Sequence, residues 1–264
     1  MTRGRAQRVL MAAGLLLCAD LAAAQAPAAA GRPAAVPPTP KAAAPIDLTG
    51  NWVSIVSEDW RFRMVTPAKG DYASVPMTPE GKRVADSWDP AQDEAAGEAC
   101  RSYGAPGLMR IPGRLRISWQ DDTTLKVETD AGTQTRLLHF GTKPPAGLAP
   151  SWQGYSVAEW EMSRPGPVRT GTPGTPSPTF GDLKVVTTGL RPGYLRKNGV
   201  PYSADVALTE YWDLHKEQNG DQWIIITTYV DDPKYLQDRF LTSTNFQKEA
   251  NGAKWDPTPC SARW

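Results

Sequence analysis

From Ile46 onward, the chain alternates short runs rich in Trp, Val, Ile, Thr and Tyr with turn-forming dipeptides. Runs of this kind are typical of strands, and Asn198-Gly199, Asn219-Gly220 and Asn251-Gly252 are typical of hairpin turns because both residues tolerate positive φ. So many short strands with almost no helix between them predict a mainly β domain, either an antiparallel meander barrel or a curved β-sandwich. The predicted strands span residues 51–57, 60–65, 114–119, 124–129, 134–140, 156–162, 183–188, 206–215, 222–230 and 239–246.

One region of the chain predicts short helices instead. Thr78-Pro79 has the pattern of an N-cap followed by a first-turn proline, for a helix that ends near Trp88. Asp89-Pro90 predicts the start of a second short helix. We expect these helices to cross one end of the sheet. Residues 163–180 are rich in Pro, Gly and Thr and are predicted to form a long flexible loop.

The beginning of the chain has the pattern of a secretory signal peptide over residues 1–24. A positively charged head is followed by an apolar run at 9–17 and a small-residue exit at 22–24. Because the apolar run is shorter than a membrane-spanning helix requires, no stable membrane insertion is expected after removal of the leader. Residues 25–45 are predicted to be a disordered Ala/Pro-rich tether, and residues 46–264 a single β-rich domain. The predicted location is periplasmic or secreted.

The cysteines support this compartment. Cys18 falls in the predicted leader, and the leucines before it differ from the small residue expected before a lipid-anchoring cysteine. Cys100 and Cys260 remain in the mature chain. In an oxidising compartment they predict one disulfide, which ties the early part of the fold to its end.

Charge and motif content argue against several classes of function. The 29 basic and 28 acidic side chains nearly cancel, so no nucleic-acid partner is predicted. With only two histidines and no Cys-x-x-Cys, a metal centre built from histidine or thiolate is excluded. A calcium ion bound by carboxylates is the alternative, but no acidic loop has the spacing of a helix-loop-helix calcium site, so we predict no metal site. The chain has no phosphate-binding glycine loop and no Gly-x-Ser-x-Gly motif. No cofactor is predicted.

A carboxylate interrupts an apolar strand face near residue 210. With alternate residues on one face, Glu210 lies in a row with Leu208 and Trp212. A carboxylate in such a row must be paired, protonated or in contact with a wet cavity. If it is buried, desolvation would raise its pKa and suit a general acid or base. The alternatives are a structural ion pair and a row end that reaches solvent.

A candidate partner lies on the strand predicted at 134–140. Arg136 shares a face with Leu138 and Phe140, so that if this face points inward, Arg136 can meet Glu210 or a ligand carboxylate. With the opposite register, His139 points inward instead. The candidate catalytic residues are therefore Glu210, Arg136 and His139, with Arg136 stabilising developing negative charge.

The ten tryptophans and eight tyrosines carry rings with a polar edge. Such rings fill β cores, but they also line sites for sugars and aromatic ligands. Several of them lie at strand margins beside Gly and Pro, where packing of the hairpin ends is the alternative interpretation. The candidate ligand-binding residues are Trp152, Tyr155, Tyr194, Tyr202 and Trp212.

Two predicted strands also carry paired arginines. Arg61 and Arg63 alternate with Trp60 and Phe62, and Arg114 and Arg116 alternate with apolar residues in the same way. On an inner surface such pairs would form an anion clamp. Because apolar residues normally take the core side, we expect all four arginines to face outward.

Gly50-Asn51-Trp52 resembles the Gly-x-Trp opening of the first strand in lipocalin-like barrels. The resemblance implies that Trp52 closes one end of a barrel and that an arginine of a late strand packs across it, with Arg239 as the candidate. The number of predicted strands and the short helices differ from an ordinary eight-stranded member. As a whole, the chain looks like a group of exported bacterial proteins, a resemblance that implies no particular activity.

These observations favour an exported barrel that binds a small, partly apolar molecule, aromatic or glycosidic in kind. The first alternative is a cofactor-independent lyase or isomerase that uses an interior carboxylate and arginine. The second is a non-catalytic interaction module of the cell envelope, with aromatic residues on a flat outer patch.

Overall fold

The computed structural model describes residues 37–163 and 180–263. The fold described below is that of the compact unit that begins at Pro38. The predicted signal peptide lies outside the described residues. Residues 164–179 of the predicted long loop also lie outside them.

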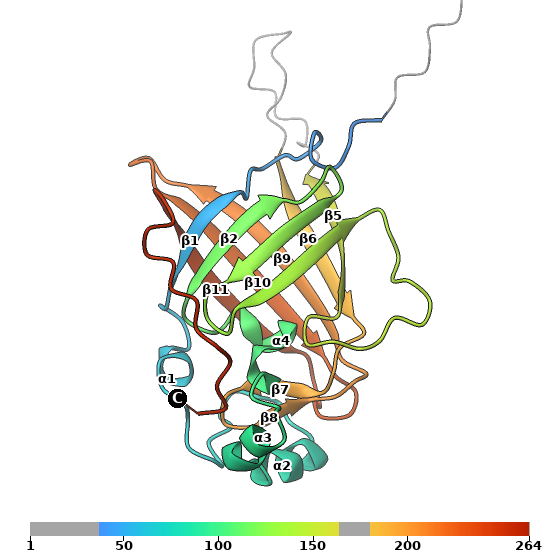
Figure 1. Ribbon diagram of the computed structural model, residues 1–264, viewed down its shortest axis with the longest axis vertical. Coiled ribbons are helices and arrows are strands. Elements are labelled where there is room, and N and C mark those ends of the chain that lie inside the picture. The colour runs from blue at the N-terminus through green and yellow to red at the C-terminus, as the bar shows by residue number, and fades with distance from the viewer. Residues whose placement is uncertain (1–36, 164–179, 264) are drawn as a thin grey trace, which may run out of the picture. The chain divides into compact units, whose positions relative to one another are not determined.

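Nine strands form a closed barrel, which confirms the expected mainly β fold (Figure 1). They are β1 (Gly50–Ile55), β2 (Arg114–Trp119), β3 (Thr124–Thr129), β4 (Gln134–Phe140), β5 (Tyr155–Ser163), β6 (Phe180–Thr188), β9 (Ala207–Lys216), β10 (Gln222–Asp231) and β11 (Phe240–Glu249). Their order around the barrel is β1-β11-β10-β9-β6-β5-β4-β3-β2. Apart from the strand predicted at 60–65, every predicted strand corresponds to one of these.

One pair of neighbouring barrel strands is parallel. Leu138 of β4 pairs with Ser156 of β5 in parallel register, whereas the other neighbouring barrel strands are antiparallel. A closed ring with an odd number of strands cannot alternate direction all the way round, so it requires such a pair. Residues 141–154 connect the two strands.

The helices gather at one end of the barrel, which we call the helical end (Figure 1). They are α1 (Trp60–Arg63), α2 (Pro79–Asp86), α3 (Pro90–Ala95), the 3-10 helix η1 (Arg101–Tyr103) and α4 (Ala105–Leu108), together with a hairpin of β7 (Gly193–Arg196) and β8 (Val200–Tyr202). The predicted N-caps are confirmed, because Thr78 Oγ1 accepts a hydrogen bond from Gly81 N at 3.0 Å and Asp89 Oδ1 accepts one from Ala91 N at 2.9 Å.

The opposite end of the barrel, which we call the mouth, is crossed by residues 38–49 (Figure 1). Lys41 N donates to Asp122 O at 3.1 Å, and Trp160 Nε1 donates to Pro40 O at 2.9 Å. The last residues of the predicted tether therefore contact the barrel.

The predicted strand at 60–65 is wrong, because this segment contains helix α1. Both edges of β1 are already paired, with β2 and β11, so the closed barrel has no free edge for another strand. Asp59, with φ of 49°, turns the chain directly before the helix. This turn leaves Arg61 exposed but buries Arg63, which contradicts the outward position expected for Arg63.

The outward positions predicted for Arg114 and Arg116 are confirmed. Leu115 and Ile117, which alternate with them on β2, are buried in the core. Arg114 Nε donates to Glu249 at 3.0 Å. The Arg116 guanidinium lies 4.2 Å from the ring centre of Trp255.

The interior contains two hydrophobic clusters. The first includes Trp52, Trp212 and Phe246, together with Leu108 and Met109 at the helical end. The second includes Tyr202 and Leu208, and it lies towards the helical end. The hydrophobic core therefore extends from the barrel interior into the elements of the helical end.

Trp52 is fully buried, and its Nε1 donates to Leu48 O at 3.0 Å. Arg239 does not pack across it, because its Nε donates instead to Asp231 at 2.8 Å on the surface. The cation near the Trp52 ring is Lys248, whose ammonium lies 5.2 Å from the ring centre.

The predicted disulfide joins Cys100 to Cys260 across a sequence separation of 160 residues. It fixes the segment that follows β11 to the helical end of the barrel, next to η1.

Within the part of the chain that the structure describes, no helix is long and apolar enough to cross a membrane.

Candidate functional site

Two of the three candidate catalytic residues meet inside the barrel. Arg136 Nη1 donates to Glu210 Oε1 at 3.0 Å, and Arg136 Nη2 donates to Glu210 Oε2 at 2.6 Å. Both side chains are almost completely removed from solvent. The bidentate geometry is the strongest form of an arginine–carboxylate pair. The structure thus selects the register in which Arg136, and not His139, points inward.

Hydroxyl groups surround this pair. Arg136 Nη2 also lies 3.3 Å from Thr187 Oγ1, and the hydroxyls of Thr187 and Ser156 are 2.7 Å apart. Along β9, Glu210 separates Leu208 of one hydrophobic cluster from Trp212 of the other. The ion pair therefore lies between residues of the two hydrophobic clusters. In this position the Glu210 carboxylate is neutralised and hydrogen-bonded, as a buried charge must be.

His139 lies on the other face of β4, outside the barrel. Its ring stacks on Tyr155 with a distance of 4.5 Å between ring centres. Partial burial lowers the pKa of His139, and the negative charge of Asp121 opposes this effect. His139 and the interior ion pair are thus on opposite sides of the sheet and do not form one catalytic group.

The candidate ligand-binding residues do not form a single site. Trp212 and Tyr202 are fully buried core residues, and Tyr194 is nearly so. Trp152 lies under the Arg191 guanidinium, at 4.2 Å from the guanidinium carbon to the ring centre. The Tyr155 hydroxyl is 2.9 Å from the hydroxyl of Thr142 on the outer surface.

Tyr194 and Tyr202 do line a common pocket of about 170 Å³ at the helical end. Tyr194 Oη donates to Asp93 Oδ2 at 2.9 Å, and Asp93 Oδ1 accepts from Arg101 Nη1 at 2.7 Å. Burial, followed by the hydrogen bond to Asp93, raises the pKa of Tyr194 despite the nearby Arg101. The charges of this pocket are therefore paired with one another.

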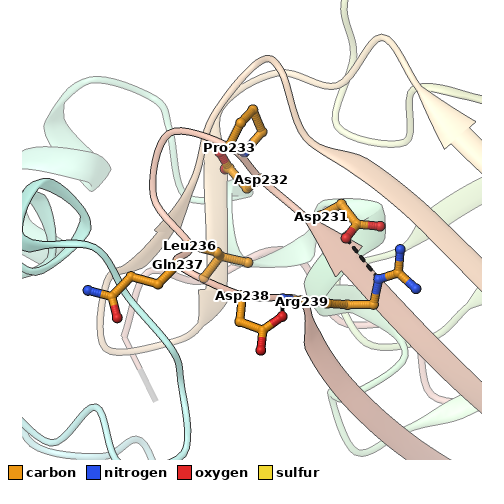
Figure 2. A pocket seen from close by; sticks show the side chains of 7 residues that line it. All are labelled: Asp231, Asp232, Pro233, Leu236, Gln237, Asp238 and Arg239. Atoms are coloured by element: carbon orange, nitrogen blue, oxygen red, sulfur yellow. Dashed lines mark hydrogen bonds and ion pairs between the residues drawn. The ribbon is translucent and has the colours of Figure 1, made fainter.

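A second pocket, of about 530 Å³, lies at the turn between β10 and β11 (Figure 2). Asp232 accepts hydrogen bonds there from Ser203 N, Ser203 Oγ and the backbone N–H groups of residues 234 and 235. The dashed line in Figure 2 marks the bond between Asp231 and Arg239. The buried Asp232 thus fixes the turn, and its hydrogen-bonding capacity is used within the fold.

A third cavity, of about 840 Å³, lies at the mouth of the barrel. Its apolar lining includes Ile46, Trp119 and Leu214, and its charged lining includes Lys41 and Lys216. A mainly apolar wall with a few charged groups at the edge is typical of sites for small amphiphilic ligands.

The Trp119 ring of this mouth cavity belongs to a group of three aromatic rings. The ring centre of Trp119 is 5.5 Å from that of Phe140, and Phe140 is 5.2 Å from Trp160. Trp119 and Trp160 are themselves 6.4 Å apart, which places the three rings in mutual contact. They come from β2, β4 and β5, and Trp119, which lines the cavity, packs against the other two rings.

The sequence interpretation did not identify the residues of the mouth cavity as a site. One sequence feature could have indicated this site. Trp119 ends a predicted strand just before the Asp121-Asp122 turn, where a large ring lies at one end of the sheet. No pattern in the sequence brings Trp119 next to Leu214 or to residues 38–49, because these segments meet only when the barrel closes.

In comparisons of this chain with models of protein families, with curated proteins and with solved structures, no match was found. Among residues 37–163 and 180–263, no three His, Cys, Asp or Glu side chains are grouped as a metal site would require.

Proposed function

We propose that this protein is an exported barrel that binds a small, partly apolar molecule, aromatic or glycosidic in kind, at its mouth. The observation that carries the proposal is the cavity of about 840 Å³ lined by Trp119, Ile46 and Leu214. A volume of this size is within the range of known small-molecule sites, roughly 300–1,000 Å³.

The charges at the edge of the cavity favour an acidic ligand. Lys41 and Lys216 line it together with a single carboxylate, that of Asp47. An aromatic ring of the ligand would pack against Trp119, while a carboxylate or other anionic group would reach the two ammonium groups. The preferred ligand is thus a flat apolar molecule with one negative end.

Export is supported by the signal-peptide pattern at the start of the chain and by the Cys100–Cys260 disulfide. Disulfides persist mainly in oxidising compartments such as the periplasm or the extracellular space. A binding protein with this location would meet its ligand outside the cytoplasm.

Binding is favoured over catalysis because the interior carboxylate is already engaged. Glu210 is held by both terminal nitrogens of Arg136, and neither residue lines any of the cavities described above. A general base must reach the proton that it abstracts. The ion pair is therefore assigned a structural role in this proposal.

The test is a fluorescence titration of the mature protein with 8-anilinonaphthalene-1-sulfonate, an aromatic anion that fluoresces in apolar sites. We expect saturable binding to the native protein. Leu214→Asp places a negative charge in the cavity and should weaken binding at least about tenfold, since two like charges in a site of low polarity repel strongly.

Leu241→Asp is the matched control, because Leu241 is exposed and lines a different cavity, of about 400 Å³, at the helical end. We expect this variant to bind the probe as the native protein does. Equal losses in both variants, or no binding by the folded native protein, would contradict the proposal.

Once the probe is bound, competition distinguishes the two ligand classes. Displacement by 4-hydroxybenzoate would indicate an acidic ligand, and displacement by phenyl glucoside a glycosidic one.

A further inference from the structure

Three arginines are buried together at the helical end, on the far side of the barrel from the mouth. Arg63 comes from α1, Arg110 follows α4, and Arg196 is the last residue of β7. Their exposed fractions are 5 %, 6 % and 3 %, respectively. Buried arginines are rare unless their charge is compensated.

Each guanidinium is held in place by part of its hydrogen-bonding capacity. Arg63 Nε donates to Arg110 O at 2.8 Å, and Arg63 Nη1 also contacts Glu58 Oε1. Arg110 Nη2 lies 3.1 Å from Asp59 Oδ2, and Arg196 Nη1 donates to the backbone oxygen of residue 73 at 2.6 Å. The side chains are thus fixed, as in a built site.

Other nitrogens of the same groups have no hydrogen-bond partner among the described residues. They are Arg63 Nη2, Arg110 Nη1, and Nε and Nη2 of Arg196. A buried N–H group without an acceptor is costly, and four of them in one cluster indicate that an acceptor is missing.

The charges of the cluster do not balance. Three guanidiniums face two carboxylates, since Glu58 pairs with Arg63 and Asp59 pairs with Arg110. Asp71, which also acts on Arg196, is paired with Arg61 at 2.6 Å. Burial and the charge of Arg110 lower the pKa of Arg196 to about 10, and the same two effects lower the pKa of Arg63. The cluster therefore has an excess of at least one positive charge.

The three arginines line a small cavity. They line it together with Phe62, Ser102 and Lys197, and its volume is about 20 Å³. A cavity of this size admits a particle of the size of a water molecule. A monoatomic anion is of similar size and, unlike water, brings a negative charge that offsets the excess.

We propose that Arg63, Arg110 and Arg196 form a buried binding site for a single monoatomic anion, of which chloride is the representative. The anion accepts hydrogen bonds from the unpaired guanidinium nitrogens and neutralises the positive excess. The site joins α1, the segment after α4 and β7, so occupation of the site stabilises the packing of these elements over the end of the barrel.

The direct test is a crystal of the native protein grown in or soaked with sodium bromide, measured at the bromine absorption edge. We expect an anomalous peak between the three guanidiniums. A fully occupied water molecule at this position without anomalous signal, or bromide bound only on the surface, would overturn the proposal.

A second test measures the thermal unfolding midpoint in chloride and in gluconate at constant ionic strength. We expect a saturable rise in chloride, because a ligand that binds only the native state stabilises it. Arg196→Met should abolish this dependence, whereas Arg61→Met, at an exposed arginine of the same region, should retain it. Chloride dependence of equal size in both variants would contradict the assignment. If Arg196→Met does not fold, the bromide experiment on the native protein decides.

Discussion

The Arg136–Glu210 pair carries the only interior charges that the sequence interpretation identified as partners. Burying two charges is expensive, and their attraction offsets this cost only when the geometry is good and the remaining polar atoms are satisfied. The hydroxyl groups of Ser156 and Thr187 accept hydrogen bonds from Arg136 and satisfy part of its remaining donor capacity. The pair therefore specifies how β4 and β9 face each other more than it adds net stability.

This interpretation predicts strong coupling between the two residues. Arg136→Met leaves the Glu210 carboxylate buried without a partner and should lower the free energy of unfolding by about 3–5 kcal/mol. Glu210→Leu should have a comparable effect, whereas the double variant should recover much of the loss. Urea unfolding followed by circular dichroism measures all three values. Additive losses in the double variant would show that the pair is not coupled.

Asp213, on the outer face of β9, gives a pH-dependent prediction. Burial, followed by a hydrogen bond and charge repulsion from Asp182, raises the pKa of Asp213 from 3.8 to about 6. The folded protein therefore binds more protons than the unfolded chain between these values. The stabilising contribution is complete below pH 3.8 and is lost as the pH rises through about 6.

At pH 7, Asp213→Asn should accordingly raise the free energy of unfolding, by up to about 1 kcal/mol because the site is partly exposed to solvent. At pH 3.5 the gain should vanish. Denaturant unfolding at both pH values measures the difference, with Asp256→Asn at an exposed position as the control. An equal gain at both pH values would rule out the titration of Asp213 as its cause.

Among the elements, the β7–β8 hairpin shows how a turn signal can be correct while its strands are missed. Asn198-Gly199 was predicted as a hairpin turn, and it joins β7 to β8. Both strands are too short to give an alternating pattern, which is why no strand was predicted there. Their stability comes from packing against the helices, in particular against Trp88 after α2.

Substitution of Gly199 tests this packing. Gly199 has φ of +84°, and an added Cβ would lie 2.2 Å from Trp88 Cβ. Gly220 in the β9–β10 turn has φ of +94° but nothing within 4 Å of its Cβ position. Gly220→Ala should therefore cost about 1 kcal/mol from backbone strain alone, and Gly199→Ala clearly more. Thermal unfolding compares the two, and equal losses would show that Trp88 does not pack tightly on the hairpin.

At the same scale, α1 shows the limit of pattern analysis. The alternation of Trp60 and Phe62 with Arg61 and Arg63 fits a strand, yet the segment forms a helical turn because the barrel is closed. The helix reverses the expected environment of Arg63 and places it among other buried arginines. Of the two arginines that an inner strand surface would have paired, only Arg63 is buried, and it lies on a helix rather than on a strand.

For the molecule as a whole, the disulfide is the covalent link between distant parts of the chain. Cys100 and Cys260 are 160 residues apart, and a loop of this length corresponds to about 5 kcal/mol in the chain-entropy treatment. Reduction, or the double variant Cys100→Ala/Cys260→Ala, should lower the free energy of unfolding by several kcal/mol. Guanidinium unfolding with and without reductant measures the effect. Unchanged stability would show that the C-terminal segment is not held by this bond.

The alternation of apolar and polar residues, the turn dipeptides and the caps were sufficient to predict all nine barrel strands and the starts of α2 and α3, because these depend on local backbone preferences. The disulfide followed from a count of cysteines. The parallel pair of β4 and β5 was not predictable, since it results from closing an odd number of strands into a ring.

Alternation identifies the two faces of a strand but gives no reason to choose which one points inward. Ring closure makes this choice, because only the face that meets the opposite wall is removed from water. It brings Arg136 to Glu210 across 74 residues, and it leaves His139 outside. The mouth cavity and the buried arginine cluster arise in the same way, from segments that have no relation in sequence and become neighbours only in the folded barrel.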